Sequence, residues 1–293
     1  MRHLILVLFS FYLFSCSPEG QPPEGKSESE SETLRVASLV PSITELLYEL
    51  GLDKEIVAVT EHCIVPKHVD KAKLSTGAMN PTLESILEKE PSLVFSMTNR
   101  PDIQAKMRAL GIRVEQVKTV TFEETMQYFD FVGKLVGKEV EAKALIESCR
   151  SSLDKAVLSV ENKGQRALLS IASLYDKPGK ANPWIAGQGN LYDDLLDHFK
   201  MKNAYQGEKN YLKLSTESLL ELDPDVIFIL KPFKMSPEIY AKELKAWQDK
   251  VPDLKAVKEQ KIYVLGGDYM MLTGPRIPLI IRDFQEALQK VSK

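Results

Sequence analysis

The sequence predicts an α/β protein built as two lobes with mainly parallel sheets, joined by one long helix. Short apolar strands alternate with helical patterns on both sides of the middle of the chain, a rhythm typical of parallel sheets covered by helices. Residues 138–161 contain neither glycine nor proline, and one helix–proline–strand unit occurs twice. Together these three observations favour two similar lobes over one large domain.

The first lobe is expected over residues 34–137. Its strands are short apolar runs, and its helices begin near proline, threonine or aspartate and end near glycine. We expect strands at 35–39, 56–60, 93–96 and 114–117, and helices at 41–50, from Thr82, at 102–110, and from about Phe122 to Gly137.

One helix is expected to link the lobes, over residues 138–162. Its apolar residues recur at helical spacing, among them Val140, Cys149 and Leu153. At 1.5 Å per residue this helix would be roughly 35 Å long. The second lobe is expected over 163–293, with strands at 167–172, 226–230 and 262–264 and helices at 191–199, 216–222 and 278–289.

The repeated unit aligns residues 83–95 with residues 216–228 without gaps. Thr82 and Ser215 precede the two copies as candidate N-caps, and Glu84 and Glu217 fall in the first helical turn, where a carboxylate favours the helix dipole. Two similar copies indicate two similar lobes. A site between such lobes is a usual place for a small ligand.

The first residues are typical of a signal peptide over residues 1–15. Arg2 and His3 precede an apolar run from Leu4 to Phe14 that is too short to cross a membrane. The residues before Cys16 resemble the lipobox of bacterial lipoproteins, which implies a lipidated Cys16. Residues 16–33, rich in Ser, Glu, Pro and Gly, would then form a flexible tether. A plain secretory signal with an incidental cysteine is the alternative.

Composition narrows the possible functions further. With 44% hydrophobic residues, 27% charged residues and a net charge of -3, the chain is typical of a globular protein and not of one that binds nucleic acid. Cys63 and Cys149 could form a disulfide in an oxidising compartment. The helical spacing around Cys149 is more typical of a buried thiol.

Several segments resemble one family when taken together. These are RVASLVPSITE (35–45), VAVT (57–60), MNPTLE (79–84), IYVLGGD (262–268) and GPR (274–276). They are similar to the periplasmic solute-binding proteins that deliver cobalamin and iron siderophores to ABC importers. The resemblance implies two Rossmann-like lobes joined by one rigid helix, little hinge motion, and a ligand held between the lobes.

The resemblance also implies a function and its partners. We expect an extracytoplasmic lipoprotein, acting as a monomer in the periplasm or at the cell surface, that captures a metal chelate and delivers it to an ABC permease and its ATPase. Cobalamin is the favoured ligand, with a ferric siderophore or haem next, and no covalent cofactor is expected apart from the lipid. Glu84 and Glu217 are expected to dock onto arginines of the permease, although capping alone would also explain them.

The ligand cleft is expected to be lined by loops that follow the strands. Aromatic rings suit flat, partly apolar chelates, and arginines suit carboxylate or catecholate groups. Trp184 is the strongest single candidate, against the alternative that it packs in the core. The expected residues are Pro41, Ser42, His62, Cys63, Met79, Asn80, Asn99 and Arg100 from the first lobe, and Asn182, Trp184, Tyr175, Phe233, Tyr269 and Arg276 from the second.

Glu61-His62-Cys63 is the sharpest local cluster, because imidazole and thiolate are ligands for transition metals. His62 could be an axial ligand of cobalt or iron, a wall of the cleft that does not touch the metal, or a packing residue. Three other functions stay open. The first is a receptor for a free metal ion, the second a scaffold lipoprotein without ligand, and the third a hydrolase using Cys63 with His62 or His198. The hydrolase has no support from a Gly-x-Ser-x-Gly, His-Glu-x-x-His or Walker motif, which the sequence lacks.

Overall fold

A computed structural model describes residues 33–77, 81–97, 101–117, 121–161, 164–171, 174 and 182–291. The chain from Leu34 onward forms one compact unit. The predicted signal peptide and tether lie outside the described residues. So do six predicted site residues, namely Cys16, Met79, Asn80, Asn99, Arg100 and Tyr175.

The first sheet is entirely parallel, as predicted, with its strands in the order β2-β1-β3-β4. At least one helix connects each strand to the next along the chain, because parallel strands need a crossover connection. The strands are β1 (Val36–Ser38), β2 (Ile56–Val59), β3 (Leu93–Ser96) and β4 (Arg113–Gln116), and the helices are α1 (Pro41–Glu49), α2 (Lys71–Leu74), α3 (Leu83–Leu87), α4 (Pro101–Ala109) and α5 (Phe122–Leu135).

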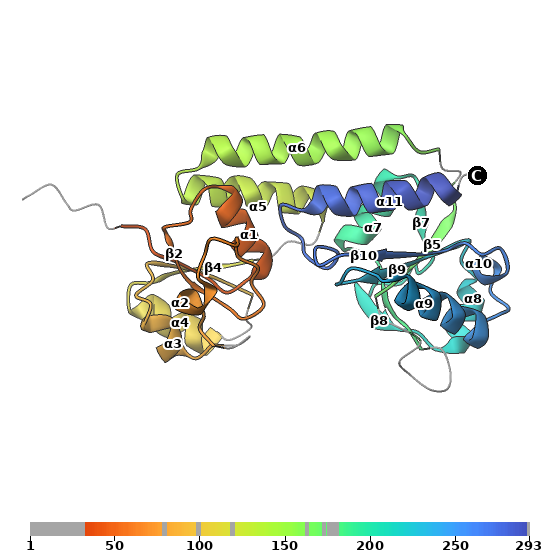
Figure 1. The fold of residues 1–293 in the computed structure, drawn as a ribbon, viewed down its shortest axis with the longest axis horizontal. Coiled ribbons are helices and arrows are strands. Elements are labelled where there is room, and N and C mark those ends of the chain that lie inside the picture. The colour runs from red at the N-terminus through yellow and green to blue at the C-terminus, as the bar shows by residue number, and fades with distance from the viewer. Residues whose placement is uncertain are drawn as a thin grey trace, which may run out of the picture. The chain divides into compact units, whose positions relative to one another are not determined.

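The long helix is α6 (Glu139–Leu158), slightly shorter at both ends than the sequence suggested. It runs along α5 and α11 (Ile277–Val291), as Figure 1 shows, and packs against both. Gly133 allows α5 to approach α6 closely, because a side chain at this position would place its Cβ 2.4 Å from the Cβ of Ala142 on α6. Cys149 lies on the buried face of α6, as its spacing predicted.

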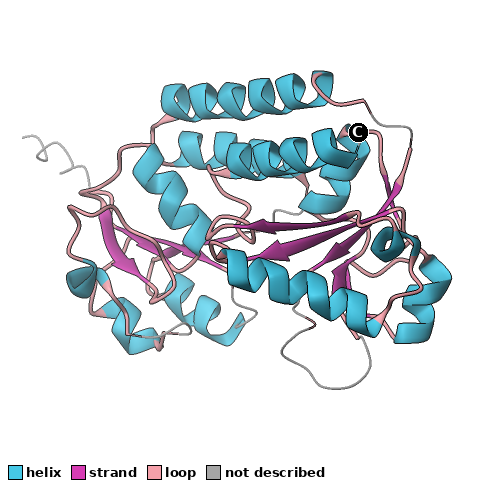
Figure 2. Ribbon diagram, turned by 45° about the vertical axis from the view of Figure 1, so that its right-hand side comes forward, coloured by secondary structure: helices cyan, strands magenta, loops and turns pink. Residues whose placement is uncertain are grey.

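The second sheet is mixed, with the order β10-β9-β5-β6-β8 and with β7 beside β5. Its parallel part is β5, β7, β9 and β10, whereas β6 and β8 are antiparallel to their neighbours. Helices flank the strands on both sides (Figure 2). The strands are β5 (Arg166–Ser170), β6 (Trp184–Ala186), β7 (Lys202–Asn203), β8 (Tyr211–Lys213), β9 (Val226–Lys231) and β10 (Ile262–Gly266). The remaining helices are α7 (Leu191–His198), α8 (Thr216–Leu222), α9 (Pro237–Lys250) and α10 (Lys255–Lys258).

The sequence repeat corresponds to a repeated structure, α3–β3 in one lobe and α8–β9 in the other. Thr82 caps α3 by accepting a hydrogen bond from the Ser85 amide at 3.2 Å, and Ser215 caps α8 in the same way from Ser218 at 3.0 Å. Before the proline of each copy stands a residue with left-handed backbone, Glu90 (φ 46°) and Asp223 (φ 36°).

Two arginines extend this equivalence beyond the aligned segments. Arg35, just before β1, donates to the carbonyls of Lys89 and Glu90, both at 2.6 Å. Arg166, the first residue of β5, donates to the carbonyls of Leu222 and Asp223 at 2.9 and 2.7 Å. These carbonyls lie at or just beyond the ends of α3 and α8, where C=O groups have no partner within the helix, so each arginine satisfies two carbonyls at one helix end.

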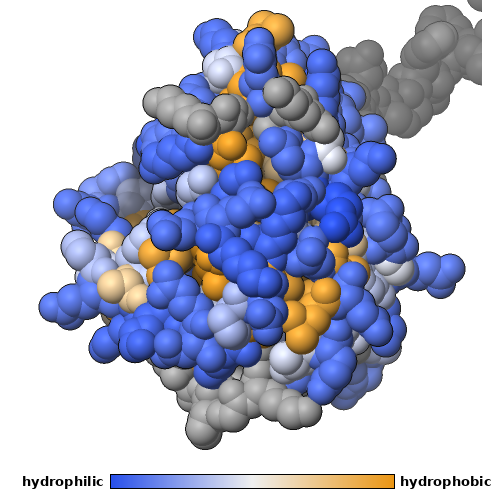
Figure 3. Space-filling view, turned by 90° about the vertical axis from the view of Figure 1, so that its right-hand side faces the viewer, coloured by the Kyte–Doolittle hydropathy of each residue, from blue (hydrophilic) through white to orange (hydrophobic). Residues whose placement is uncertain are grey.

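The surface follows the composition of the chain. Figure 3 shows a face on which hydrophilic residues predominate and hydrophobic ones gather in a few patches between them. Among the described helices none is both long and apolar enough to cross a membrane.

Candidate functional site

Pro41 and Ser42, which were predicted to line one side of the cleft, are the first two residues of α1 and follow β1 after Leu39 and Val40. Ser42 is buried, and the segment before α11 approaches it closely. A Cβ on Gly274 would lie 3.2 Å from the Cβ of Ser42. The beginning of α1 therefore contacts a part of the chain that belongs to the other lobe.

Cys63 differs from the prediction, because its side chain points into the core and is only 1% exposed. Its Sγ lies 3.0 Å from the Thr44 Oγ1, which donates to it, and 3.2 Å from the Thr60 Oγ1. Cys63 and Cys149 are both free thiols, so no disulfide joins them. The neighbouring His62 is exposed, in the turn that follows β2. Of this pair, only His62 is accessible to a ligand.

Trp184, at the start of β6, is 44% exposed and does not pack in the core. Lys213 is directly opposite it on the antiparallel strand β8, and Tyr211 is opposite Ala186. Residues opposite each other, or two apart, lie on the same face of a sheet, so Trp184, Tyr211 and Lys213 share one face. Tyr211 is 46% exposed. Tyr211 and Lys213 were not predicted as site residues, because the three residues of β8 carry too little periodicity to be recognised as a strand.

Phe233 and Asn182 are the other two predicted residues near the ends of the second sheet. Phe233 follows β9 and is 40% exposed, while Asn182 is half-buried just before β6. The loop that carries Phe233 lies against Gly266 at the end of β10. A Cβ at Gly266 would be 2.8 Å from the Phe233 carbonyl oxygen and 2.5 Å from the Met235 Cγ. A glycine is needed there for the loop to keep this position.

Tyr269 and Arg276 were predicted to contact the ligand, and the structure gives both of them protein partners. The Tyr269 hydroxyl donates to Asp283 Oδ2 at 2.8 Å, on α11. Burial, with the hydrogen bond to Asp283, raises the pKa of Tyr269. The Arg276 guanidinium lies 5.7 Å from the centre of the Tyr269 ring, a cation–π distance. These two residues therefore contact each other in addition to any ligand.

Glu45 is the partner of Arg276 that sequence reasoning missed. Arg276 Nε and Nη2 donate to the two oxygens of Glu45 at 2.9 and 2.6 Å, and its Nη1 donates to Asp268 at 2.8 Å. Burial lowers the pKa of Arg276, but the hydrogen bonds to Glu45 and Asp268 outweigh it, and the pKa is raised overall. A ligand carboxylate would have to compete with two protein carboxylates for this guanidinium.

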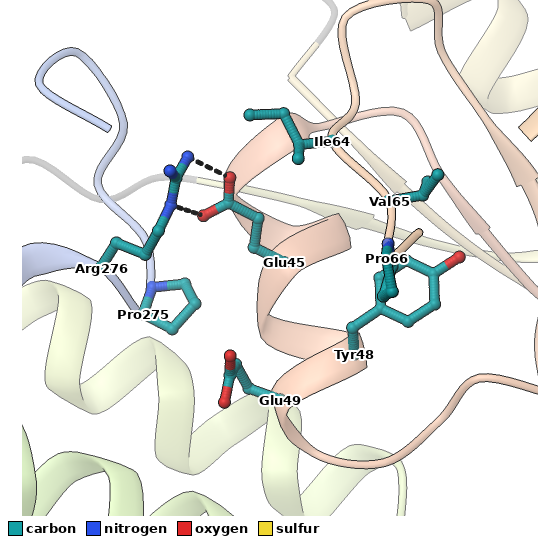
Figure 4. A pocket seen from close by; sticks show the side chains of 8 residues that line it. All are labelled: Glu45, Tyr48, Glu49, Ile64, Val65, Pro66, Pro275 and Arg276. Atoms are coloured by element: carbon teal, nitrogen blue, oxygen red, sulfur yellow. Dashed lines mark hydrogen bonds and ion pairs between the residues drawn. The ribbon is translucent and has the colours of Figure 1, made fainter. Parts of the chain in front are cut away.

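A cavity of about 190 Å³, open to solvent, lies beside this ion pair (Figure 4). One side is α1 together with the segment after β2, and the other is the segment before α11. Its walls are mostly apolar, with carboxylates at the helix side. The lining residues are Glu45, Tyr48, Glu49, Ile64, Val65, Pro66, Pro275 and Arg276. Of the predicted cleft residues, the cavity contains Arg276, and it runs along the helix that begins with Pro41 and Ser42.

The two predicted docking residues, Glu84 and Glu217, are exposed in the first turns of α3 and α8. The backbone amide of Glu84, followed by its contact with Thr82, lowers the pKa of the Glu84 carboxyl, so it is ionised at neutral pH. A second hollow borders Glu84, lined by Pro81, Thr82, Leu83, Asp102, Ile103 and Lys106. Glu84 thus stands at the edge of a polar depression.

The histidines of the body have separate surroundings. His68 Nε2 lies 2.8 Å from Asp53 Oδ1, and His198 packs edge-on against Phe122. Within the described ranges, no three His, Cys, Asp or Glu side chains are grouped so that they could hold a metal ion.

The chain has two similar α/β lobes with a solvent-open cavity between them. This architecture is that of a two-lobed binding protein. Residues 36–269 match the model of the family described as periplasmic binding protein, and the chain belongs to that family. Its relatives are solute-binding proteins, and the chain is accordingly a binding protein and not an enzyme.

Three similarities are informative. An uncharacterized ABC transporter substrate-binding lipoprotein of Bacillus subtilis, YvrC, is 25% identical over 88% of this chain and 81% of its own length. A vitamin B12-binding protein of Vibrio cholerae is 24% identical over 83% of this chain and 84% of its own. The crystal structure of a possible iron-binding, periplasmic solute-binding protein from Staphylococcus epidermidis superposes with a TM-score of 0.73 at 27% identity, covering 87% of this chain and 98% of that one. The α/β fold with one parallel and one mixed sheet is thus the fold of this family.

Proposed function

We propose that this protein captures a metal chelate between its lobes and, as a monomer, delivers it to an ABC permease and its ATPase. The observation that carries the proposal is the pair of exposed aromatic side chains Trp184 and Tyr211 on one face of the second sheet, with Phe233 also exposed on the loop after β9. The flat faces of aromatic rings that are open to solvent suit a flat, partly apolar ligand.

Cobalamin is the favoured ligand, with a ferric siderophore or haem next. The similarity to vitamin B12-binding proteins supports the first choice, and that to a possible iron-binding protein supports the second. Exposed His62 is proposed to face the chelate, where its imidazole could be an axial ligand of cobalt or iron. Lys213 adds a positive charge beside Trp184, which would suit a carboxylate or phosphate on the chelate.

Delivery is proposed to use Glu84 and Glu217, one exposed carboxylate on each lobe. Because such rim charges mainly set orientation and association rate, arginines on the permease would be suitable partners.

The protein is proposed to be held at the outer side of a membrane by lipid on Cys16, in the periplasm or at the cell surface. The lipobox-like residues and the similarity to a protein named as a lipoprotein support this proposal. Residues 16–33 would be the lipidated cysteine and the tether, and residues 1–15 a removed signal peptide.

The test is the thermal stability of the full chain in detergent with cyanocobalamin, ferric siderophores, haemin and bare metal ions, each added separately. A ligand that binds only the folded state raises the free energy of unfolding by about 2.7 kcal/mol at a hundredfold excess over its dissociation constant. We expect a clear rise with one chelate and none with the bare ions. A rise with a bare ion alone would favour a receptor for free metal ions, and no rise with any compound would contradict capture of these chelates.

A further inference from the structure

The contact between Arg276 and Glu45 joins residues that are 231 positions apart in the sequence. Glu45 is on α1 in the first lobe, and Arg276 immediately precedes α11 in the second. Two donors of one guanidinium meet both oxygens of one carboxylate, at 2.9 and 2.6 Å (Figure 4). Because this fork-to-fork geometry fixes direction as well as distance, the contact constrains how the two segments are oriented.

Arg276 is itself held firmly to its own lobe. Asp268 accepts its third hydrogen bond at 2.8 Å, and its guanidinium lies 5.7 Å from the centre of the Tyr269 ring. Tyr269 is in turn bonded to Asp283 on α11. These contacts fix Arg276 relative to α11 and to the segment before it. The hydrogen bonds from Arg276 to Glu45 therefore fix the first turn of α1 relative to the second lobe.

On the other side, Glu45 is one helical turn after Pro41, the first residue of α1, and the side chains at this spacing share a face. Glu45 is buried, so its carboxylate would be costly to leave without a partner. Gly274 lies against Ser42 in the same turn, and the cavity borders both Glu45 and Arg276. The pair thus stands where the two lobes meet at the start of α1.

We propose that Glu45 and Arg276 are the positioning pair of the interlobe cleft, holding the first turn of α1 at a fixed distance from residues 268–276 before any ligand binds. The inference rests on the proposed function, in which this cleft receives the chelate. A cleft already at its working width loses less conformational freedom when the ligand enters, which strengthens binding.

The experiment measures the distance between the lobes in the ligand-free full chain, in detergent. Spin labels would be attached at Lys54→Cys and Lys242→Cys, two exposed positions in different lobes, with Cys16→Ser so that this position carries no third label. Cys63 and Cys149 are buried and should label slowly. We expect a narrow distance distribution for the unaltered pair, and a broader one with a longer mean distance for Glu45→Gln.

Glu49→Gln is the matched control. It removes an exposed carboxylate one turn further along α1, at the edge of the same cavity, and leaves the hydrogen bonds of Arg276 in place, so the distribution should stay narrow. Glu45→Asp, which keeps the charge on a shorter side chain, should give an intermediate width, and the thermal midpoint of each variant shows whether it is folded. An unchanged distribution in Glu45→Gln, or an equal broadening in Glu49→Gln, would overturn the inference. Since no ligand is used, this outcome is independent of whether any chelate binds.

Discussion

The two tryptophans of the chain have opposite surroundings. Trp247 on α9 is fully buried in the second lobe, whereas Trp184 is 44% exposed beside Tyr211 and Lys213. Substitution of the buried one should therefore affect folding, and substitution of the exposed one should affect what the surface binds.

Trp184→Ala is expected to weaken binding of the identified chelate about tenfold, which is about 1.4 kcal/mol, because a stacking surface is lost. The midpoint of thermal unfolding should change little. Trp247→Phe is the control and should do the reverse, lowering the midpoint with little change in affinity. Titration calorimetry and thermal unfolding of both variants check this prediction. Unchanged affinity in Trp184→Ala would remove Trp184 from the site.

For individual residues, the sequence predicted which segments border the cavity better than it predicted the role of each residue. It placed Arg276 beside the cleft, and the cavity does contain Arg276, but a sequence does not show that a residue 231 positions away takes up the guanidinium. Glu45 was inside a recognised segment and had no assigned role for the same reason. Cys63 was predicted in the cleft because it follows a strand. Its thiol is instead buried in the core, where it lies within hydrogen-bonding distance of the hydroxyls of Thr44 and Thr60.

Among the elements, the repeated unit was predicted without gaps, because caps, prolines and apolar strands are all local signals. The structure extends the equivalence to Arg35 and Arg166, whose hydrogen bonds to a helix end have no local signature. Strands β6 and β8 were not predicted, because runs of three residues carry too little periodicity. Helix α9 was also not predicted, although it begins with a Ser236 cap and a proline at its first position, both of which are helix-start signals.

Glu84→Gln and Glu217→Gln are expected to slow association with the permease several-fold each, and more when combined, because each removes one charge that steers docking. Thr82 and Ser215 would still cap the two helices, so stability should hardly change. Glu88→Gln and Glu221→Gln, exposed on or next to the same helices, are matched controls. Binding of the variants to the permease in nanodiscs at two salt concentrations checks this. If the control variants associate with the permease as slowly as the test variants do, the general surface charge and not these two residues determines docking.

For the molecule as a whole, the two-lobed α/β fold was predicted because it follows from the order of the elements. Where the lobes touch was not predictable. Asp194 on α7 accepts a hydrogen bond from the Phe122 amide at 2.7 Å, and so caps α5 across the lobes. That contact, the packing of α6 on α5 and α11, and the Glu45–Arg276 pair hold the lobes in place, and two of the three depend on side chains far apart in the sequence.

The attachment of the whole protein to a membrane gives a separate prediction. Cys16→Ser is expected to abolish fatty-acid labelling of the chain in bacteria and to move it out of the membrane fraction, because the acylated thiol is removed. Cys149→Ala, at a buried position in α6, is the control and should keep the label. Labelling that persists in Cys16→Ser would contradict a lipid anchor at this position.

Gly274 approaches Ser42 so closely that residue 274 acts as a spacer between the lobes. A Cβ at residue 274 would lie 3.2 Å from the Cβ of Ser42, so one of the two segments would have to move by a few tenths of an ångström to make room for it. The absence of a side chain at this one position therefore lets the two segments lie as close together as they do.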